Sequence, residues 1–121
     1  MVVVLTEQQC RYAMDHGEFD SEILLSAPRV AIVLTQSWCP QWMRMRTYLQ
    51  NVESLVHSEN HLNTMIFYLE YDTVPWFETF MEFKENIFNN REIPYVRYYK
   101  NGKLTGESNY VSLEGFVSRL R

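Results

Sequence analysis

The most constraining stretch of the sequence is an apolar, β-branched run that leads into a cysteine and a proline. Residues 30–34 read Val-Ala-Ile-Val-Leu, and a continuous run of this kind is typical of a central strand with both faces covered. Cys39 and Pro40 follow shortly after it, and proline suits the first position of a helix. A cysteine at a helix start lies at the positive end of the helix dipole, which favours thiolate over thiol. The sequence therefore predicts a reactive thiol where a buried strand meets a helix.

The hydrophobic pattern predicts strands and helices in alternation along the rest of the chain. Strands are expected over residues 2–5, 30–34, 64–71, 95–99 and 104–108. Four main helices are expected over residues 7–16, 40–57, 75–88 and 113–120, with a short one over 22–26. This order implies parallel neighbouring strands joined by right-handed crossovers, and a closing hairpin that makes one edge antiparallel. The expected fold class is α/β, with a central mixed sheet of about five strands flanked by about four helices in a single domain, residues 1–121.

Local signals mark where several of these elements begin. Thr6 and Gln9 have the spacing of a capping box at the start of the first helix. Thr73 is expected to cap the third main helix, and Ser112 the last one. Asn101-Gly102 is the strongest short hairpin signal, and it joins the last two strands.

Charge and composition exclude several classes of protein. A net charge of −4, without clustered basic residues, argues against a nucleic-acid-binding surface. No stretch reaches the roughly 18 apolar residues of a transmembrane helix, and the first residues lack the basic start of a signal peptide. A cytoplasmic, reducing setting is therefore expected, in which Cys10 and Cys39 are free thiols. Cys10 is interpreted as a small buried hydrophobic residue.

Two motifs stand in a characteristic order along the chain. Trp38-Cys39-Pro40-Gln41 follows a hydrophobic strand, and Ile93-Pro94-Tyr95 precedes a hairpin with Lys100-Asn101-Gly102-Lys103. In this order they resemble the W-C-x-x-C site, the I-P-T segment and the K-N-G turn of the thioredoxin family. The resemblance covers nearly the whole chain and implies a thioredoxin-like fold, in which the proline is cis and lies against the active cysteine.

The sequence departs from that family at the positions that complete its redox site. Trp42 stands where thioredoxins have the second, resolving cysteine. Val33 stands in place of a buried aspartate that serves proton transfer at the resolving thiol. The two losses are consistent, because a buried carboxylate with no proton to move would only destabilise the fold. Turnover as a dithiol reductase is therefore expected to be absent or very poor.

The resemblance places a candidate nucleophile, Cys39, beside a set of candidate substrate-binding residues. The residues expected around the thiol are Trp38, Pro40, Trp42, Trp76, Ile93, Pro94 and Tyr95. Trp42 also fits the buried stripe of its helix, which favours a core position from which its bulk could shield the thiol. For Trp38, Trp76 and Tyr95, ordinary packing is as consistent with the sequence as a peptide-binding surface.

Two functions are consistent with the sequence. In the first, Cys39 carries out monothiol thiol–disulfide exchange, and glutathione or a protein thiol releases the product. In the second, the chain is a non-catalytic interaction module that binds a peptide segment in the groove around Trp38, Trp76 and Pro94. A cluster bridged by glutathione between two copies has only Cys39 to support it. No metal site is expected, and the only small molecule implied is glutathione, as a co-substrate.

Overall fold

The computed structural model describes residues 2–60 and 63–121, with the side chains of 53–60 excepted. Its strands are β1 (Val2–Val4), β2 (Arg29–Thr35), β3 (Thr64–Glu70), β4 (Tyr95–Lys100) and β5 (Lys103–Ser108). Its helices are α1 (Glu7–His16), α2 (Ser21–Leu24), α3 (Pro40–Asn60), α4 (Phe77–Asn86) and α5 (Leu113–Leu120), with a 3-10 turn η1 (Tyr71–Thr73). The elements follow the predicted order.

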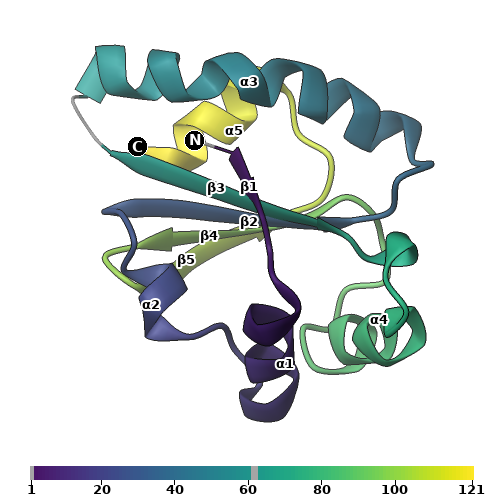
Figure 1. Cartoon of the computed structure of the whole chain (residues 1–121). Coiled ribbons are helices and arrows are strands. Elements are labelled where there is room, and N and C mark those ends of the chain that lie inside the picture. Colours follow the sequence, from purple (N-terminus) through teal and green to yellow (C-terminus); the bar gives the residue numbers. More distant parts are fainter. Residues whose placement is uncertain (1, 61–62) are drawn as a thin grey trace.

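The five strands form one mixed sheet in the order β1-β3-β2-β4-β5. β1 and β2 pair parallel with β3, whereas β4 pairs antiparallel with β2, and β5 antiparallel with β4. α3 and α5 lie on one face of the sheet, and α1, α2 and α4 lie on the other (Figure 1). The predicted α/β class and the mixed five-stranded sheet are confirmed.

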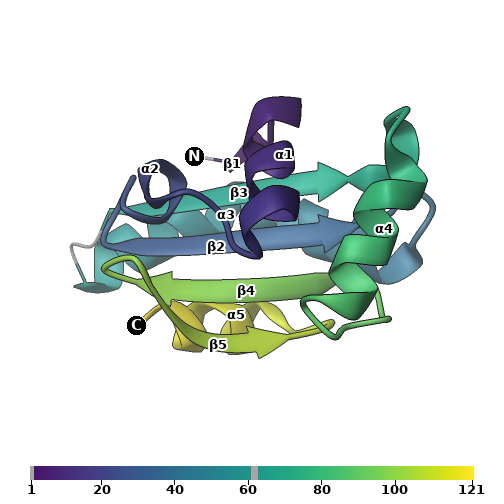
Figure 2. The same cartoon turned by 90° about the horizontal axis from the view of Figure 1, so that it is seen from below.

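The direction of β4 differs from the prediction. The alternation of strands and helices predicted parallel neighbours up to the hairpin, yet β4 runs antiparallel to β2. The reason is the placement of α4, which lies across the carboxyl-terminal end of β3 instead of running back along the sheet (Figure 2). The chain therefore re-enters the sheet at that same end. This also brings the segment 87–94 to the carboxyl ends of β2 and β3, where ligands gather in open α/β sheets.

Two apolar clusters fill the space between the sheet and its covering helices. β2 supplies both of them, because successive side chains of a strand point to opposite faces. Val33 belongs to the cluster under α3 and α5, whereas Ile32 and Leu34 belong to the cluster under α1, α2 and α4. All residues from Val30 to Thr35 are buried, as the apolar run predicted for a central strand.

The local signals predicted several element ends correctly. At α1 the capping box is complete, since the Gln9 N–H donates to Thr6 Oγ1 at 3.1 Å and the Thr6 N–H to Gln9 Oε1 at 2.9 Å. Ser112 caps α5 through its hydroxyl oxygen. In the hairpin turn, Asn101 and Gly102 have φ of 51° and 82°, the left-handed conformation that asparagine and glycine tolerate.

Several predicted helix ends differ from the structure, most clearly at α4 and α3. Thr73 does not cap α4, because its hydroxyl donates to the Glu70 carbonyl at 2.7 Å within η1. α4 instead begins at Phe77, with Trp76 at its N-cap position and no side-chain cap. α3 also continues to Asn60, past the predicted end at residue 57.

Candidate functional site

Cys39 occupies the junction that the sequence predicted, immediately before α3. Its N–H donates to the Gln36 carbonyl at 3.2 Å, and its own carbonyl accepts from the Met43 N–H at 3.1 Å to begin the helix. Only 4% of its surface is exposed. The thiol Sγ lies 3.9 Å from the carbonyl oxygen of Ile93, so the S–H group can donate weakly to it. The fold therefore brings together the two motifs on which the resemblance rests.

The turn before Cys39 is fixed by residues from the end of β3. Asp72 accepts the Ser37 N–H at 2.7 Å with one carboxylate oxygen and the Ser37 hydroxyl at 2.6 Å with the other. Gln36 Nε2 donates to the hydroxyl of Tyr71 at 3.3 Å. The indole N–H of Trp38 donates back to Gln36 Oε1 at 2.6 Å. These bonds hold the thiol at the carboxyl ends of both β2 and β3. Sequence reasoning missed the role of Asp72, although an aspartate directly after a buried strand is a usable signal.

Trp38 is the one candidate ring that lies on the surface of the site. It is 61% exposed, and Met43, one helical turn further on, is 53% exposed. Pro40 and Gln41 between them are also exposed. The start of α3 thus exposes two large apolar side chains, Trp38 and Met43, on either side of Cys39 in the sequence.

Trp42 is a core residue and does not belong to a solvent-facing groove. It is 1% exposed and packs in the same apolar cluster as Cys39 and Val33. Its indole N–H donates to Glu70 Oε2 at 2.8 Å, and its ring lies 5.7 Å from that of Tyr68. The position of a resolving thiol is thus filled by a large apolar ring whose only polar atom has a partner. The core position favoured by the buried stripe of its helix is confirmed, and a role of Trp42 in substrate binding stays a prediction.

The segment before β4 presents its backbone to the thiol. The Ile93–Pro94 peptide bond is cis. Pro94 is buried and Ile93 half-buried, and Ile93 packs against the cluster that contains Cys39. Asn109 Nδ2 donates to the Pro94 carbonyl at 3.1 Å, which ties the segment to the chain after β5.

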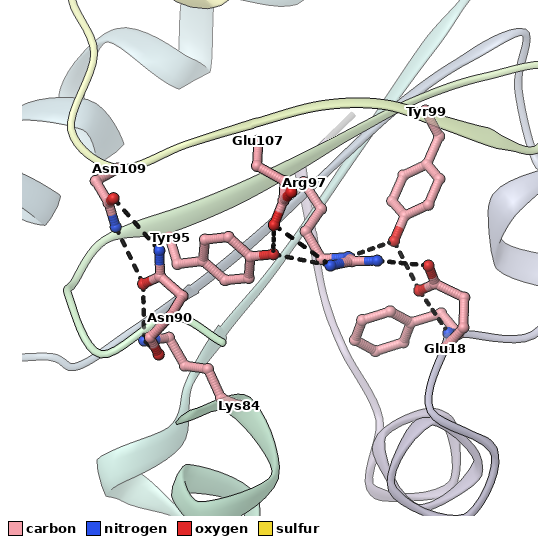
Figure 3. A network of polar contacts seen from close by, with 9 residues as sticks. Glu18, Lys84, Asn90, Tyr95, Arg97, Tyr99, Glu107 and Asn109 are labelled. Carbon is pink, nitrogen blue, oxygen red and sulfur yellow. Dashed lines mark hydrogen bonds and ion pairs between the residues drawn. The ribbon is translucent and has the colours of Figure 1, made fainter. Parts of the chain in front are cut away.

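Tyr95 does not line the site. As the first residue of β4, it points to the face of the sheet opposite Cys39, where it is fully buried. Its hydroxyl donates to Glu107 and accepts from Arg97 Nη1 at 2.8 Å (Figure 3). The prediction was wrong because adjacent residues of a strand face opposite ways. Trp76 is half-buried and packs edge-on against Phe80, with ring centroids 5.8 Å apart, in that same opposite cluster.

The described residues offer no further redox or metal partner for Cys39. Cys10 is a buried free thiol in the other apolar cluster. No group of three or more His, Cys, Asp or Glu that could hold a metal ion occurs among the residues searched. The His57 side chain and His61 lie outside the described residues. None of the described helices is long and apolar enough to span a membrane.

Comparisons with known proteins place the architecture. No protein-family model matches the chain, and no curated protein matches it in sequence. Solved structures do. Thioredoxin O1 from Arabidopsis thaliana in its oxidised state superimposes with a TM-score of 0.67 at 15% identity, over 98% of this chain and 96% of that one. Trxlp from Edwardsiella tarda (TM-score 0.61, 16% identity) covers 99% and 98%, and oxidised thioredoxin from Plasmodium falciparum (0.60, 16%) covers 98% and 97%. The chain has the thioredoxin fold.

Proposed function

We propose that this thioredoxin-fold chain carries out monothiol thiol–disulfide exchange with Cys39 as the nucleophile. The observation that carries the proposal is the placement of Cys39 at the start of the 21-residue helix α3, 3.9 Å from the Ile93 carbonyl. Free N–H groups at a helix start and the helix dipole stabilise a thiolate there. A thiolate beside the backbone of Ile93 suits attack on a disulfide in an extended peptide.

The exchange takes two steps. In the first, the Cys39 thiolate attacks one sulfur of a disulfide, the S–S bond breaks, and the other sulfur leaves as a thiolate. The product is a mixed disulfide on Cys39. In the second, an external thiol such as glutathione attacks that mixed disulfide and releases the Cys39 thiolate. One disulfide is consumed and one is formed, so no further oxidant or reductant is needed.

In this proposal, the thiol that resolves the mixed disulfide on Cys39 comes from another molecule. Cys10 and Cys39 are the two cysteines of the sequence, and they lie in different apolar clusters on opposite faces of the sheet. Trp42 fills the space one turn along α3. A reducing cytoplasm rich in glutathione suits such a protein, and its partner is glutathione or a protein thiol.

The test is the formation of a mixed disulfide at Cys39. The protein carrying Cys10→Ala is incubated with oxidised glutathione, and the glutathione adduct is counted by mass spectrometry. We expect one adduct per chain, none in a protein that also carries Cys39→Ser, and release of the adduct by reduced glutathione. A folded protein that stays unmodified would contradict the proposal.

The second candidate function, a non-catalytic peptide-binding module, is favoured by a different observation. The thiol is 4% exposed, whereas the neighbouring Trp38 and Met43 are more than half exposed. Exposed Trp and Met residues are typical of binding surfaces. The two functions differ in their dependence on Cys39. A module would bind its peptide equally well with Cys39→Ser and lose binding with Trp38→Ala, whereas an exchange protein loses its reaction with Cys39→Ser.

A further inference from the structure

Lys84 on α4 is a lysine that is buried to 0% exposure. Its ammonium group donates three hydrogen bonds: to the Glu92 carbonyl at 2.7 Å, the Asn90 carbonyl at 3.0 Å and Asn90 Oδ1 at 3.3 Å. Figure 3 shows Lys84 beside Asn90. Within the described part of the chain, no carboxylate forms an ion pair with it. A buried ammonium usually has a carboxylate partner, so this arrangement needs an explanation.

The acceptors of Lys84 belong to the segment that carries the site. The Glu92 carbonyl, held by Lys84, is followed directly by the Ile93 carbonyl, which faces the Cys39 thiol at 3.9 Å. Lys84 therefore binds one backbone carbonyl, that of Glu92, and Cys39 contacts the next one, that of Ile93. A shift of the Glu92 carbonyl would therefore also move the Ile93 carbonyl.

The amide of Asn90 extends this control to the other side of Ile93. Asn90 Oδ1 accepts from Lys84 Nζ, from the Glu92 N–H at 3.0 Å and from Asn109 Nδ2 at 3.1 Å. Asn109 Nδ2 also donates to the Pro94 carbonyl at 3.1 Å. The residues on both sides of Ile93 are thus connected to the ammonium group.

Filling space does not account for Lys84. A methionine of similar length would fill the same site without the cost of burying an ammonium, which carbonyl groups and aromatic faces offset only in part. The rings of Tyr71 and Tyr95 lie 6.0 Å and 5.6 Å from Lys84 Nζ, within the range of cation–π attraction. The hydrogen bonds from the Lys84 ammonium group to Asn90 and Glu92 explain why a charged side chain is buried here.

We propose that Lys84 is a positioning residue for exchange at Cys39, whose charged ammonium keeps residues 90–94 in place so that Ile93 and Pro94 present their backbone to a peptide disulfide. This inference rests on the proposed function. Loss of the proton removes the charge that strengthens the three hydrogen bonds, because bonds from an ionised donor are about twice as strong as neutral ones. The segment is then held less firmly, and extended substrates are aligned less well.

The surroundings of Lys84 make this loss accessible at mildly alkaline pH. Burial lowers the pKa of Lys84 to about 8, and the negative charges of Glu85 and Glu92 oppose the shift. Tyr71 of η1 and Tyr95 of β4 face the ammonium, and burial raises the pKa of each above its ordinary value of 10. Both phenols therefore stay neutral while the lysine titrates.

The experiment compares two reactions of the same thiol in a protein that carries Cys10→Ala. The first is attack on an extended cysteine peptide disulfide-linked to 5-thio-2-nitrobenzoate, which transfers the peptide to Cys39 and releases the coloured thiolate. The second is alkylation by iodoacetamide, which needs no peptide alignment. Both need the Cys39 thiolate, so the ratio of their rates cancels the titration of Cys39 and reports alignment alone.

We expect Lys84→Met to lower this ratio at pH 7 on the order of tenfold, since a misplaced substrate loses rate steeply. Lys103→Met, at an exposed lysine of the hairpin, is the matched control and keeps the ratio. In the parent protein the ratio is expected to fall between pH 7 and 9.5 toward the value of Lys84→Met, which itself stays flat.

A folded Lys84→Met protein whose ratio stays within about twofold of the parent would overturn the inference. If that variant does not fold, the parent decides, because a ratio that is flat from pH 7 to 9.5 contradicts the role of the charge. Iodoacetamide alkylation of Cys39 without any release of the coloured thiolate overturns the proposed function, and this inference with it. Exchange that proceeds in the parent, with the same ratio of exchange to alkylation in Lys84→Met, overturns this inference alone.

Discussion

The two faces of the sheet bury different kinds of side chain. The face under α1, α2 and α4 holds Lys84 and Arg97, the two charged side chains classed as buried in the described part of the chain. The face under α3 and α5 holds Cys39 and Trp42 in an apolar cluster. Val33 and Trp42, which stand where the resemblance implies a buried aspartate and a second cysteine, both lie in this cluster. The buried charges lie on the opposite face, where one of them reaches the segment that faces the thiol.

The two buried cations themselves differ in their partners. Arg97 pairs with Glu18 at 2.6 Å and Glu107 at 3.8 Å, and its guanidinium lies over the Phe88 ring at 3.8 Å (Figure 3). Burial alone would lower the pKa of Arg97, but Tyr99 and Glu18 outweigh it and the pKa is raised. Lys84 has carbonyl partners, and its pKa falls to about 8. Arg97 therefore keeps its positive charge, whereas Lys84 can lose its charge.

Trp42→Cys would break the contrast between the faces by returning a second thiol to the apolar one, and it has the largest expected effect. Replacing a fully buried indole with a small side chain costs about 4 kcal/mol of the free energy of unfolding, because a cavity remains and Glu70 loses one of its two donors, the other being Arg46. The variant is expected to gain reduction of insulin disulfides, since the two thiols then lie one helical turn apart. Urea unfolding and insulin turbidity measure the two effects.

Trp42→Phe is the matched control for that variant. It keeps most of the apolar volume, supplies no thiol, and leaves Glu70 without the indole donor. We expect a loss of about 1–2 kcal/mol and no insulin reduction. A folded Trp42→Cys protein that gains no activity would show that the groove, and not only the missing thiol, differs from a dithiol reductase.

Arg97→Met sharpens the comparison on the charged face. Removing the guanidinium takes one hydrogen-bond donor from Glu18 and one from each of the two phenol groups, and we expect a loss of about 3 kcal/mol in the free energy of unfolding. The estimate is at the lower end for a broken buried pair, because both glutamates are partly exposed and can be rehydrated. Arg11→Met, which breaks an exposed pair with Glu7 on α1, should cost less than about 0.5 kcal/mol.

The reactivity of Cys39 distinguishes the role of Arg97 from that of Lys84. Arg97→Met should leave the ratio of peptide exchange to alkylation unchanged at pH 7, because none of its contacts reaches residues 90–94 among the described interactions. A fall in that ratio as large as that of Lys84→Met would mean that the whole face, and not one lysine, aligns the substrate.

Sequence reasoning reached the fold because its signals are local. The run at 30–34, the capping box of Thr6 and the turn at Asn101-Gly102 each specify backbone geometry within a few residues, and together they order the elements. The direction of β4 was missed, because it depends on where α4 packs against the sheet. The resemblance alone placed Tyr95 beside the thiol, although successive side chains of a strand point to opposite faces of the sheet.

In the candidate site, too, the residues marked by a local motif were predicted and those that depend on tertiary packing were not. Cys39 and Ile93 were predicted together from two motifs, and the structure places them 3.9 Å apart. Lys84 was not among the predicted site residues. Its partners are backbone carbonyls, and every residue type has one, so no pattern of letters could identify them.

Lys84→Met tests the lysine through stability as well as reactivity, with a smaller effect. At pH 7 we expect a change of about 1 kcal/mol or less, because an apolar side chain of similar volume replaces a costly buried charge. The folded pKa of Lys84, about 8, lies below its unfolded value of 10.5. Between these values the unfolded chain binds more protons, so stability rises with pH. Relative to Lys84→Met, the parent should therefore gain stability between pH 8 and about 10.5, as measured by urea unfolding at each pH.

No effect on exchange is expected from Cys10, the cysteine on the same face of the sheet as Lys84 and Arg97. Burial, with a smaller contribution from Glu7, raises the pKa of Cys10 to about 12, so the thiol is neutral and unreactive in the folded protein. Cys10→Ala should cost about 1 kcal/mol at pH 7 and leave exchange at Cys39 unchanged. The pH dependence has the opposite sign to that of Lys84. Because the unfolded thiol loses its proton near its ordinary value of about 9 while the folded one keeps it, the parent loses stability relative to Cys10→Ala above that pH. Alkylation of Cys10 in the native parent, at a rate near that of Cys39, would contradict the assignment of exchange chemistry to one face.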